Sequence, residues 1–262
     1  MERHPKDFGS QEMVAEYNPD FLGYPTDVTL GADGSGMKMA EAVGGVLVAM
    51  DQANYHPIAT VYNGGSRSMQ TAINSGAIIV NAGGKRFVNE KQAYEIVAYA
   101  VLEQEGGHAY CILDQTLLEY DSIKNDVGLS GIVDMYVKAD TIEELAGKLG
   151  IDADGLKATI ETYGSYVQNG ADEEFGRVAS SMNSDLSTPP YYAVIGSPET
   201  HTVKGGVVTD ACTHVLDASG ARIPGLYAAG EVAVSPVGGG STNTVCLAMG
   251  RIAAREVAQF LK

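Results

Sequence analysis

An acidic residue and a glycine-rich helix start follow one another near the end of the sequence. In the segment Ile223-Pro-Gly-Leu-Tyr-Ala-Ala-Gly-Glu231, Pro224-Gly225 is expected to form a turn and Leu226 to Ala229 a short apolar strand, which stops at Gly230 and leaves Glu231 at its carboxyl end. Residues 238–243 then combine three glycines with cap-forming Ser, Thr and Asn, and apolar residues recur at helical spacing from Val245. This pattern predicts a carboxylate that accepts hydrogen bonds from hydroxyl groups, beside a helix N-terminus that stabilises an electron-rich group.

A flavin carries both kinds of group. Its pyrimidine edge gains electron density on reduction, and its ribityl chain offers hydroxyl groups. The alternative is an ordinary strand–helix unit in which the glycines only permit close packing, and a single glycine cluster would favour that alternative. The complete order of strand, acidic residue, glycine cluster and helix favours the flavin site. The residues expected to contact the cofactor are Gly230, Glu231, Gly240, Ser241, Thr242 and Asn243.

The composition predicts a soluble globular protein. The chain has 262 residues, of which 45% are hydrophobic, enough for one large or two ordinary domains. Its 17 Lys and Arg against 33 Asp and Glu give a net charge of −16, which disfavours binding to nucleic acid or to an anionic membrane surface. No apolar run reaches the length of a membrane span. The three cysteines are widely spaced, so neither a disulfide framework nor a metal site is expected.

Periodicity and turn residues predict the order of the elements. A capping box at Thr141–Glu144 indicates the start of a helix that runs to about residue 149. A glycine pair between two apolar runs, 76–81 and 85–88, indicates a hairpin. The remaining expected helices are 37–43, 89–103, 156–167 and 245–261, and the remaining expected strands are 46–50, 108–113, 205–208, 214–217 and 226–229.

These elements suggest a discontinuous arrangement of domains. A mixed α+β middle part covers residues 51–202, and a glycine-rich α/β part is made of the two chain ends, 1–50 and 203–262. An inserted domain creates a cleft at its two crossover points, where ligands commonly bind. His56 and His201 lie near the two crossovers.

Motifs along nearly the whole chain resemble the FAD-dependent fumarate reductase, urocanate reductase and ketosteroid dehydrogenase superfamily. The motifs that carry the resemblance are Gly31-Ala-Asp-Gly-Ser-Gly36, His56-Pro57, Gly84-Lys-Arg-Phe-Val-Asn-Glu90, Thr141-Ile-Glu-Glu-Leu-Ala146 with Thr159 and Tyr163, Pro190-Tyr-Tyr-Ala193, Gly205-Gly-Val-Val208, Ile223 to Glu231 and Gly250-Arg-Ile-Ala253. The resemblance implies a clamp (capping) domain inserted into the C-terminal part of an α/β FAD-binding domain. The N-terminal βαβ half of that domain, with its GxGxxG pyrophosphate turn, is expected to be missing, so this chain alone should bind FAD poorly.

The resemblance also implies a proton donor. The fumarate and urocanate reductases place an arginine four residues after the glutamate that corresponds to Glu90, and this chain has Tyr94 there, as the ketosteroid dehydrogenases do. Two proton-relay residues of the fumarate reductases fall near Gln70 and Ile73, so that relay is expected to be absent. Without the motif, Tyr94 would be read as a core residue of an amphipathic helix.

Departures near the final glycines bear on the substrate. The arginine that clamps the substrate carboxylate falls at Val237, so a dicarboxylate would lack its charge partner. The second tyrosine of the ketosteroid enzymes falls at about Pro236, which argues against a steroid.

Two histidines are implied as substrate ligands. His56 matches the family histidine that hydrogen-bonds the activating carbonyl or carboxylate, and either His201 or Thr202 could face the site. A structural histidine is the more frequent role for an isolated residue of this type. Arg86 and Glu90, four residues apart, are predicted to form a structural ion pair.

The sequence therefore predicts an FAD-dependent oxidoreductase fragment that transfers a hydride between flavin N5 and an activated C=C bond, with Tyr94 as proton donor. Dehydrogenation of a cyclic ketone and a non-catalytic clamp fragment are the alternatives. The candidate partners are a small molecule with an activated double bond, an electron-donor protein and a separate N-terminal FAD-binding half. No compartment is indicated, because any export signal would lie in the half expected to be missing.

Overall fold

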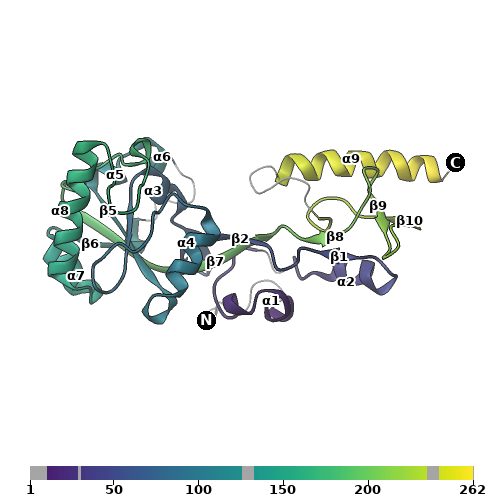
Figure 1. Cartoon of the computed structure of the whole chain (residues 1–262), viewed down its shortest axis with the longest axis horizontal. Coiled ribbons are helices and arrows are strands. Elements are labelled where there is room, and N and C mark those ends of the chain that lie inside the picture. The colour runs from purple at the N-terminus through teal and green to yellow at the C-terminus, as the bar shows by residue number, and fades with distance from the viewer. Residues whose placement is uncertain (1–10, 29–30, 126–132, 235–241, 262) are drawn as a thin grey trace. The chain divides into compact units, whose positions relative to one another are not determined.

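The protein has a mixed helix-and-sheet fold that divides into two compact units (Figure 1). The structure, a computed structural model, describes residues 11–28, 31–125, 133–234 and 242–261, with the side chains of the last segment described from Asn243. Within these residues, unit 1 comprises Tyr24–Asp27 and Tyr55–Thr200, and unit 2 comprises the remainder.

Unit 1 is built on a six-stranded sheet. Its strand order is β3-β2-β7-β5-β4, and β6 also pairs with β7. Strand β5 is fully buried and contacts β4 and β7 in antiparallel register, which explains why it reads as a continuous apolar run. The strands are β2 (Ala53–Tyr62), β3 (Gly65–Ser68), β4 (Ile78–Val80), β5 (Ala109–Asp114), β6 (Val137–Ala139) and β7 (Tyr191–Val203).

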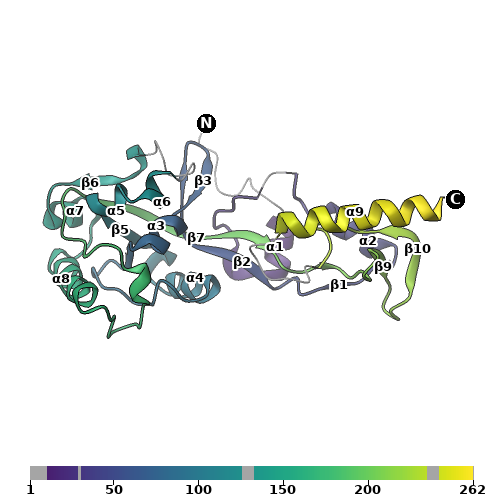
Figure 2. The ribbon, with the colours of Figure 1, turned by 90° about the horizontal axis from the view of Figure 1, so that it is seen from above.

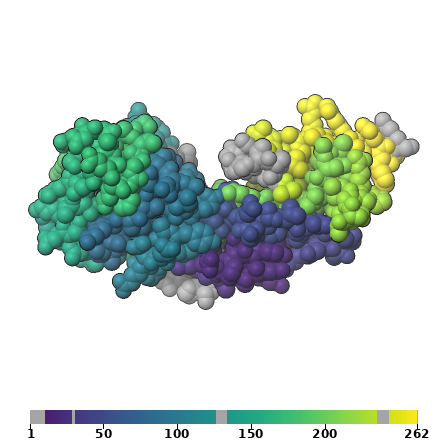
Figure 3. Space-filling view, viewed as in Figure 1, coloured from purple at the N-terminus to yellow at the C-terminus, as the bar shows by residue number. Residues whose placement is uncertain are grey.

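Helices pack on this sheet and enclose the larger hydrophobic core of the chain. The predicted capping box is confirmed, because the Thr141 hydroxyl accepts the Glu144 backbone N–H at 3.1 Å and begins α7. Helices α7 and α8 lie side by side in both ribbon views (Figure 2) and form a continuous surface over one end of unit 1 (Figure 3). The helices of unit 1 are α3 (Gln70–Ser75), α4 (Tyr94–Leu102), α5 (Gln115–Leu118), α6 (Asp121–Lys124), α7 (Ile142–Leu149) and α8 (Ala153–Asn169), with short 3-10 turns at Glu105–Gly107, Val133–Met135 and Ala179–Ser181.

The expected hairpin around residues 76–88 forms only partly. Its first strand is β4, but its second is reduced to one bridge between Val80 and Arg86. Gly84 adopts φ of 68° in the turn, where an added Cβ would lie 2.8 Å from the Asp152 carbonyl oxygen and collide with the start of α8. The Thr159 hydroxyl donates to the Gly84 carbonyl at 2.6 Å. The turn is therefore held against α8, which limits pairing beyond Arg86.

Helix α4 starts later than the sequence predicts. The expected start was Asn89, but the helix begins at Tyr94. The Asn89 carboxamide oxygen accepts the Lys91 backbone N–H at 2.8 Å, and its carbonyl accepts Gln92 N–H at 3.1 Å. These local bonds hold residues 89–92 in a turn that competes with helix formation, and this places Tyr94 in the first turn of α4.

A buried ion cluster joins the segment after the turn to the loop after α8. The Arg86 guanidinium, 1% exposed, donates to both oxygens of Glu90 and to both oxygens of Asp172 at 2.8–3.2 Å. Arg177 donates to the carbonyls of Ala77 and Ile73 and lies 3.4 Å from Glu90. The predicted Arg86–Glu90 ion pair is confirmed, and it belongs to a larger structural network.

Unit 2 has a smaller core, formed by Ala40, Val207, Val215, Ala228 and Ala233. It contains two antiparallel pairs, β1 with β8 and β9 with β10. Gly206 packs so tightly that an added Cβ would lie 2.7 Å from the Ala233 carbonyl carbon, which explains the glycine pair at 205–206. The elements are α1 (Gln11–Tyr17), the 3-10 turn Pro19–Phe21, α2 (Ser35–Ala42), β1 (Leu47–Val48), β8 (Gly206–Val207), β9 (His214–Leu216), β10 (Arg222–Tyr227) and α9 (Thr242–Phe260).

Strand β10 differs from its prediction in both bounds, since residues 226–229 were expected and Arg222–Tyr227 are observed. A register shift between Arg222 and Tyr227 accommodates Pro224 and Gly225, so the strand extends through the predicted turn. Among the helices that the structure describes, none is long and apolar enough to cross a membrane.

Candidate functional site

His56 is held by a strand in the interior of the unit 1 sheet. It lies on β2, which pairs with β3 in antiparallel register and neighbours β7. Its side chain is 18% exposed, and its Nδ1 atom lies 2.7 Å from Oε1 of Glu199 on β7. The tautomer of the imidazole determines which group donates in this contact, and an ionised carboxylate, which only accepts hydrogen bonds, would pair with a proton on Nδ1. The ring is thereby fixed through one of its two nitrogens.

Glu199 was not among the predicted site residues. Its side chain is 1% exposed, and its second oxygen, Oε2, accepts a hydrogen bond from the Ser66 hydroxyl on β3. Both carboxylate oxygens therefore have a partner inside unit 1. The sequence shows only a glutamate within a long strand, and this does not indicate which side chain Glu199 contacts.

Tyr94 lies close to His56. It is the first residue of α4 and is 37% exposed, and its ring centroid lies 6.4 Å from that of His56 with the planes tilted by 55°. The two rings are therefore neighbours, and a phenol and an imidazole are both side chains that can take part in proton transfer. The structure thus brings together two of the predicted catalytic residues, and the phenol remains accessible.

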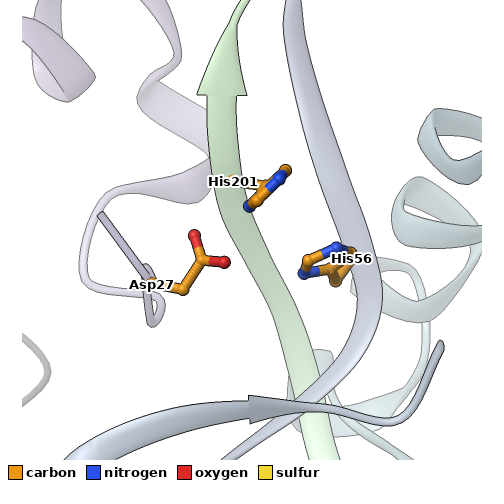
Figure 4. Close-up of side chains that lie close together, drawn as sticks. All are labelled: Asp27, His56 and His201. Carbon is orange, nitrogen blue, oxygen red and sulfur yellow. The ribbon is translucent and has the colours of Figure 1, made fainter. Parts of the chain in front are cut away.

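His201 and Thr202 follow on the last part of β7. One ligand atom each of Asp27, His56 and His201 lie within 4.8 Å of one another, and the three side chains converge in the close-up (Figure 4). The Thr202 hydroxyl instead accepts a hydrogen bond from the Asn54 carboxamide at 2.8 Å. His201 and Thr202, the two alternatives that the sequence left open, therefore have different surroundings. Asp27 is a neighbour of both histidines that the sequence did not indicate.

The two relay positions of the fumarate reductases carry no charge here. Ile73 is fully buried in the core of unit 1. Gln70 is buried and donates from Nε2 to the Asn74 carboxamide oxygen at 3.2 Å, and that oxygen also accepts from Lys91 at 2.6 Å. Burial, followed by the charge of Arg177, lowers the pKa of Lys91 below its ordinary value.

The predicted flavin-contacting residues that the structure describes lie in unit 2. Gly230, just beyond β10, adopts φ of 85°, a conformation that favours glycine, and an added Cβ would lie 3.6 Å from Sγ of Cys246 on α9. The end of β10 therefore approaches the first turns of α9. Glu231 and Asn243 are exposed beside this junction, and α9 begins at Thr242. Gly240 and Ser241, together with Pro236 and Val237, lie outside the described residues.

The sequence matches one family model over most of its length. A family described as FAD binding domain matches residues 5–243. The fumarate reductase (cytochrome) of Shewanella frigidimarina is 34% identical over 97% of this chain and 44% of its own length. The 3-oxosteroid 1-dehydrogenase of Mycobacterium tuberculosis (strain ATCC 25618 / H37Rv) is 31% identical over 89% of this chain and 48% of its own.

A solved structure supports the same assignment of fold. The open conformation of a flavocytochrome c3 fumarate reductase superposes with a TM-score of 0.77 at 31% identity, covering 98% of this chain and 45% of that one. The chain thus spans less than half the length of each of these proteins. The resemblance predicted from the motifs is confirmed.

Proposed function

This chain belongs to the FAD binding domain family of flavoproteins, and we propose that it supplies the proton-transfer and substrate-binding groups of an FAD-dependent oxidoreductase acting on an activated C=C bond. The observation that carries the proposal is the proximity of Tyr94 to His56, whose ring centroids lie 6.4 Å apart within unit 1. A proton donor and a group able to polarise a carbonyl are the two side-chain functions that reduction of an activated alkene requires.

The residues of unit 2 fit the cofactor that the family implies. Gly230 leaves the end of β10 without a side chain, and the exposed Glu231 has an ionisable carboxylate free to meet solvent or hydroxyl groups. The first turn of α9 offers backbone N–H groups that its own helix does not use. We propose that Gly230, Glu231, Thr242 and Asn243 hold the isoalloxazine and ribityl portions of FAD, with Gly240 and Ser241 contributing from the preceding segment.

Bound FAD supplies the hydride chemistry. Tyr94 holds a proton on its hydroxyl oxygen, because a phenol is protonated at neutral pH, and donates it to the carbon adjacent to the one that receives the hydride. His56 and His201 hydrogen-bond the carbonyl or carboxylate that activates the double bond, and they stabilise charge that develops there. Thr202 is the further candidate for a substrate contact.

The substrate that we propose is not a dicarboxylate. The charged relay of the fumarate reductases is replaced by the buried Gln70 and the fully buried Ile73, and valine stands at position 237, where a carboxylate-clamping arginine was expected. An activated alkene with one carbonyl or carboxylate group meets the groups that remain. The reverse reaction, dehydrogenation of a cyclic ketone, uses the same residues with Tyr94 as the base.

The test of Tyr94 is its replacement by phenylalanine in the FAD-loaded, full-length protein. We expect Tyr94→Phe to lower turnover by about 10²- to 10⁴-fold, the usual contribution of a general acid, while the flavin absorbance spectrum is unchanged. Tyr120→Phe is the matched control, because Tyr120 has similar exposure, 41% against 37%, but lies at the start of α6. Full turnover in Tyr94→Phe would refute the role.

The direction and the substrate class are tested by the flavin spectrum. We expect 2-cyclohexenone to reoxidise the pre-reduced flavin and fumarate to leave it reduced. Bleaching of the oxidised flavin by cyclohexanone would instead favour the dehydrogenase reaction. Reoxidation by fumarate at a comparable rate would contradict the proposal that the substrate is not a dicarboxylate.

A second candidate function is that of a clamp fragment that completes an FAD site together with another polypeptide. Its support is the exposure of large apolar side chains on α9 and α2 of unit 2, namely Leu247, Phe260, Met39 and, just after α2, Val43. The candidate partner is the half of an FAD-binding domain that carries the pyrophosphate turn. Purifying the chain alone tests this, since a stoichiometric flavin spectrum without any partner would contradict the fragment hypothesis.

A further inference from the structure

Glu199 is a buried carboxylate whose environment differs from that of the other buried acids in unit 1. Glu90 and Asp172 are neutralised by Arg86 and Arg177. Glu199, by contrast, has no arginine or lysine partner among the described residues, and its ion-pairing neighbour is His56. Burying a charge costs free energy unless it is paired and hydrogen-bonded, so this arrangement requires an explanation.

We propose that Glu199 is a positioning residue for His56: its carboxylate accepts the Nδ1–H bond, fixes the imidazole in the Nδ1-protonated form and holds the ring beside Tyr94. The proposal rests on the proposed function for its chemical meaning, because it takes His56 as the group that contacts the substrate. Its geometric basis is independent of FAD and of the substrate. It consists of the 2.7 Å contact from Nδ1 to Oε1 and the burial of both carboxylate oxygens.

Ser66 keeps the carboxylate in place. Its hydroxyl donates to Oε2, the oxygen that does not face His56. Ser66 lies on β3, His56 on β2 and Glu199 on β7, which are three neighbouring strands of one sheet. The orientation of the imidazole is therefore set by backbone pairing through two successive hydrogen bonds, which is the kind of support that keeps a catalytic side chain in a productive position.

The contact with Glu199 determines what His56 can do. A neutral imidazole has one donor and one acceptor nitrogen, and a charged imidazole has two donors. With Nδ1 donating to Glu199, the ring can donate from Nε2 to a substrate carbonyl only as the imidazolium, and Glu199 then supplies the balancing negative charge. The neutral ring would present Nε2 as an acceptor. Glu199 thus supplies a buried counter-ion to the His56 imidazolium when the carbonyl is polarised, and the ligand atoms of Asp27 and His201 also lie within 4.8 Å of that of His56.

The tautomer of His56 can be read directly by NMR. The full chain, labelled with ¹⁵N-histidine and kept in EDTA to exclude metal ions, contains five histidines, and His56→Gln identifies the signals of His56. Long-range ¹H–¹⁵N spectra distinguish the two neutral tautomers and the imidazolium. An unconstrained neutral imidazole prefers the Nε2–H form, so an Nδ1–H form at high pH is diagnostic.

We expect the neutral imidazole of wild-type His56 to carry its proton on Nδ1. Glu199→Ala should convert it predominantly to the Nε2–H form, whereas Glu199→Gln, which keeps an acceptor oxygen, should retain the Nδ1–H form in part. A wild-type Nε2–H form would overturn the proposal, and so would an unchanged His56 tautomer in folded Glu199→Ala. If Glu199→Ala does not fold, the wild-type spectrum and that of Ser66→Ala, expected to show a mixture of tautomers, still decide the question.

Turnover of the FAD-loaded, full-length protein separates positioning from a merely structural role. Glu199→Gln should lower kcat/KM by about 10-fold and His56→Gln by about 10²-fold, with the double variant no worse than His56→Gln because the two residues act as a unit. Additive losses would contradict the coupling. Because the NMR test needs neither FAD nor substrate, an Nδ1–H form together with an active Tyr94→Phe variant would refute the proposed function alone.

Discussion

Replacing Arg86 by methionine would remove the charge around which the buried cluster of unit 1 is assembled. The guanidinium makes four hydrogen bonds, two to Glu90 and two to Asp172, and is 1% exposed. Burial alone would lower the pKa of Arg86, but the hydrogen bonds and charges of the two carboxylates raise it well above its ordinary value. Methionine keeps much of the volume, so the substitution tests the charge more than the packing.

The magnitude follows from what the substitution leaves behind. Removing one partner of a buried ion pair costs about 3–5 kcal/mol, because the other charge remains without compensation. Arg86→Met leaves two carboxylates, which argues for the upper part of that range. Arg177, 3.4 Å from Glu90, and the backbone N–H groups that bind Asp172 offset part of the loss. We expect a loss of about 4 kcal/mol in the free energy of unfolding, or roughly 8–16 °C in Tm.

The assay is urea unfolding of the full chain followed by far-UV circular dichroism and tyrosine fluorescence, since the sequence contains no tryptophan. Lys157→Met is the matched control: it removes a cation from an exposed ion pair with Glu143, and its midpoint should stay within error of wild type. Replacing Arg86, Glu90 and Asp172 together by apolar residues, while Arg177 keeps its backbone carbonyl partners, should restore part of the lost stability. A midpoint for Arg86→Met equal to that of Lys157→Met would refute the reasoning.

Three further predictions concern acid stability, thiol reactivity and the turn before α8. Burial raises the pKa of Asp172, but the hydrogen bonds and charge of Arg86 and the backbone N–H groups of Phe175 and Arg177 together lower it more, so the net shift is downward. The contribution of Asp172 to the free energy of unfolding is therefore fully present above the pKa of an aspartate in the unfolded chain, about 4. It is lost as the pH falls through the lower pKa of Asp172 in the folded chain. Urea midpoints between pH 7 and 3 should therefore fall less steeply in Asp172→Asn than in wild type, and equal slopes would contradict this. Burial raises the pKa of Cys111 to about 12, so we expect a thiol reagent at pH 8 to label Cys212 and Cys246 in the native chain and all three cysteines in urea. If mass spectrometry finds that Cys111 in the native chain is labelled as fast as Cys212 and Cys246, the prediction is wrong. Gly84→Ala should lower Tm because of its φ of 68° and its contact with α8, whereas Gly147→Ala, which meets nothing within 4 Å, should leave Tm unchanged or raise it, and the reverse order would contradict the packing.

Features that depend on short stretches of chain were predictable from the sequence. The Thr141 capping box, the pair Arg86–Glu90 and the amphipathic α8 each arise from residues three or four apart, and the structure contains all three. The predicted bounds of elements are wrong where a competing interaction determines where the helix or strand begins or ends. Asn89 binds backbone N–H groups in a turn and delays α4, and the register shift in β10 carries the strand through Pro224 and Gly225.

The candidate site was predictable only in part. His56 and Tyr94 were identified by motif, yet no spacing rule relates two residues 38 positions apart in sequence, and their proximity comes from the placement of α4 beside β2. The delayed start of α4 matters here, because it places Tyr94 in the first turn, where the phenol remains exposed. A competition between a turn and a helix over residues 89–93 thus decides where the candidate proton donor lies.

Glu199 could not have been found from the sequence, for a physical reason. A carboxylate in a strand normally faces solvent. The burial of Glu199 beside His56 depends on the sheet bringing together two residues that are 143 positions apart in the sequence. Side chains alternate between the two faces of a strand, so a shift of β7 by one residue would place Thr200 where Glu199 now lies. The register of β7 against β2 therefore sets the electrostatic environment of His56. A substitution that disturbs this register without touching either residue should change the His56 tautomer as Glu199→Ala does.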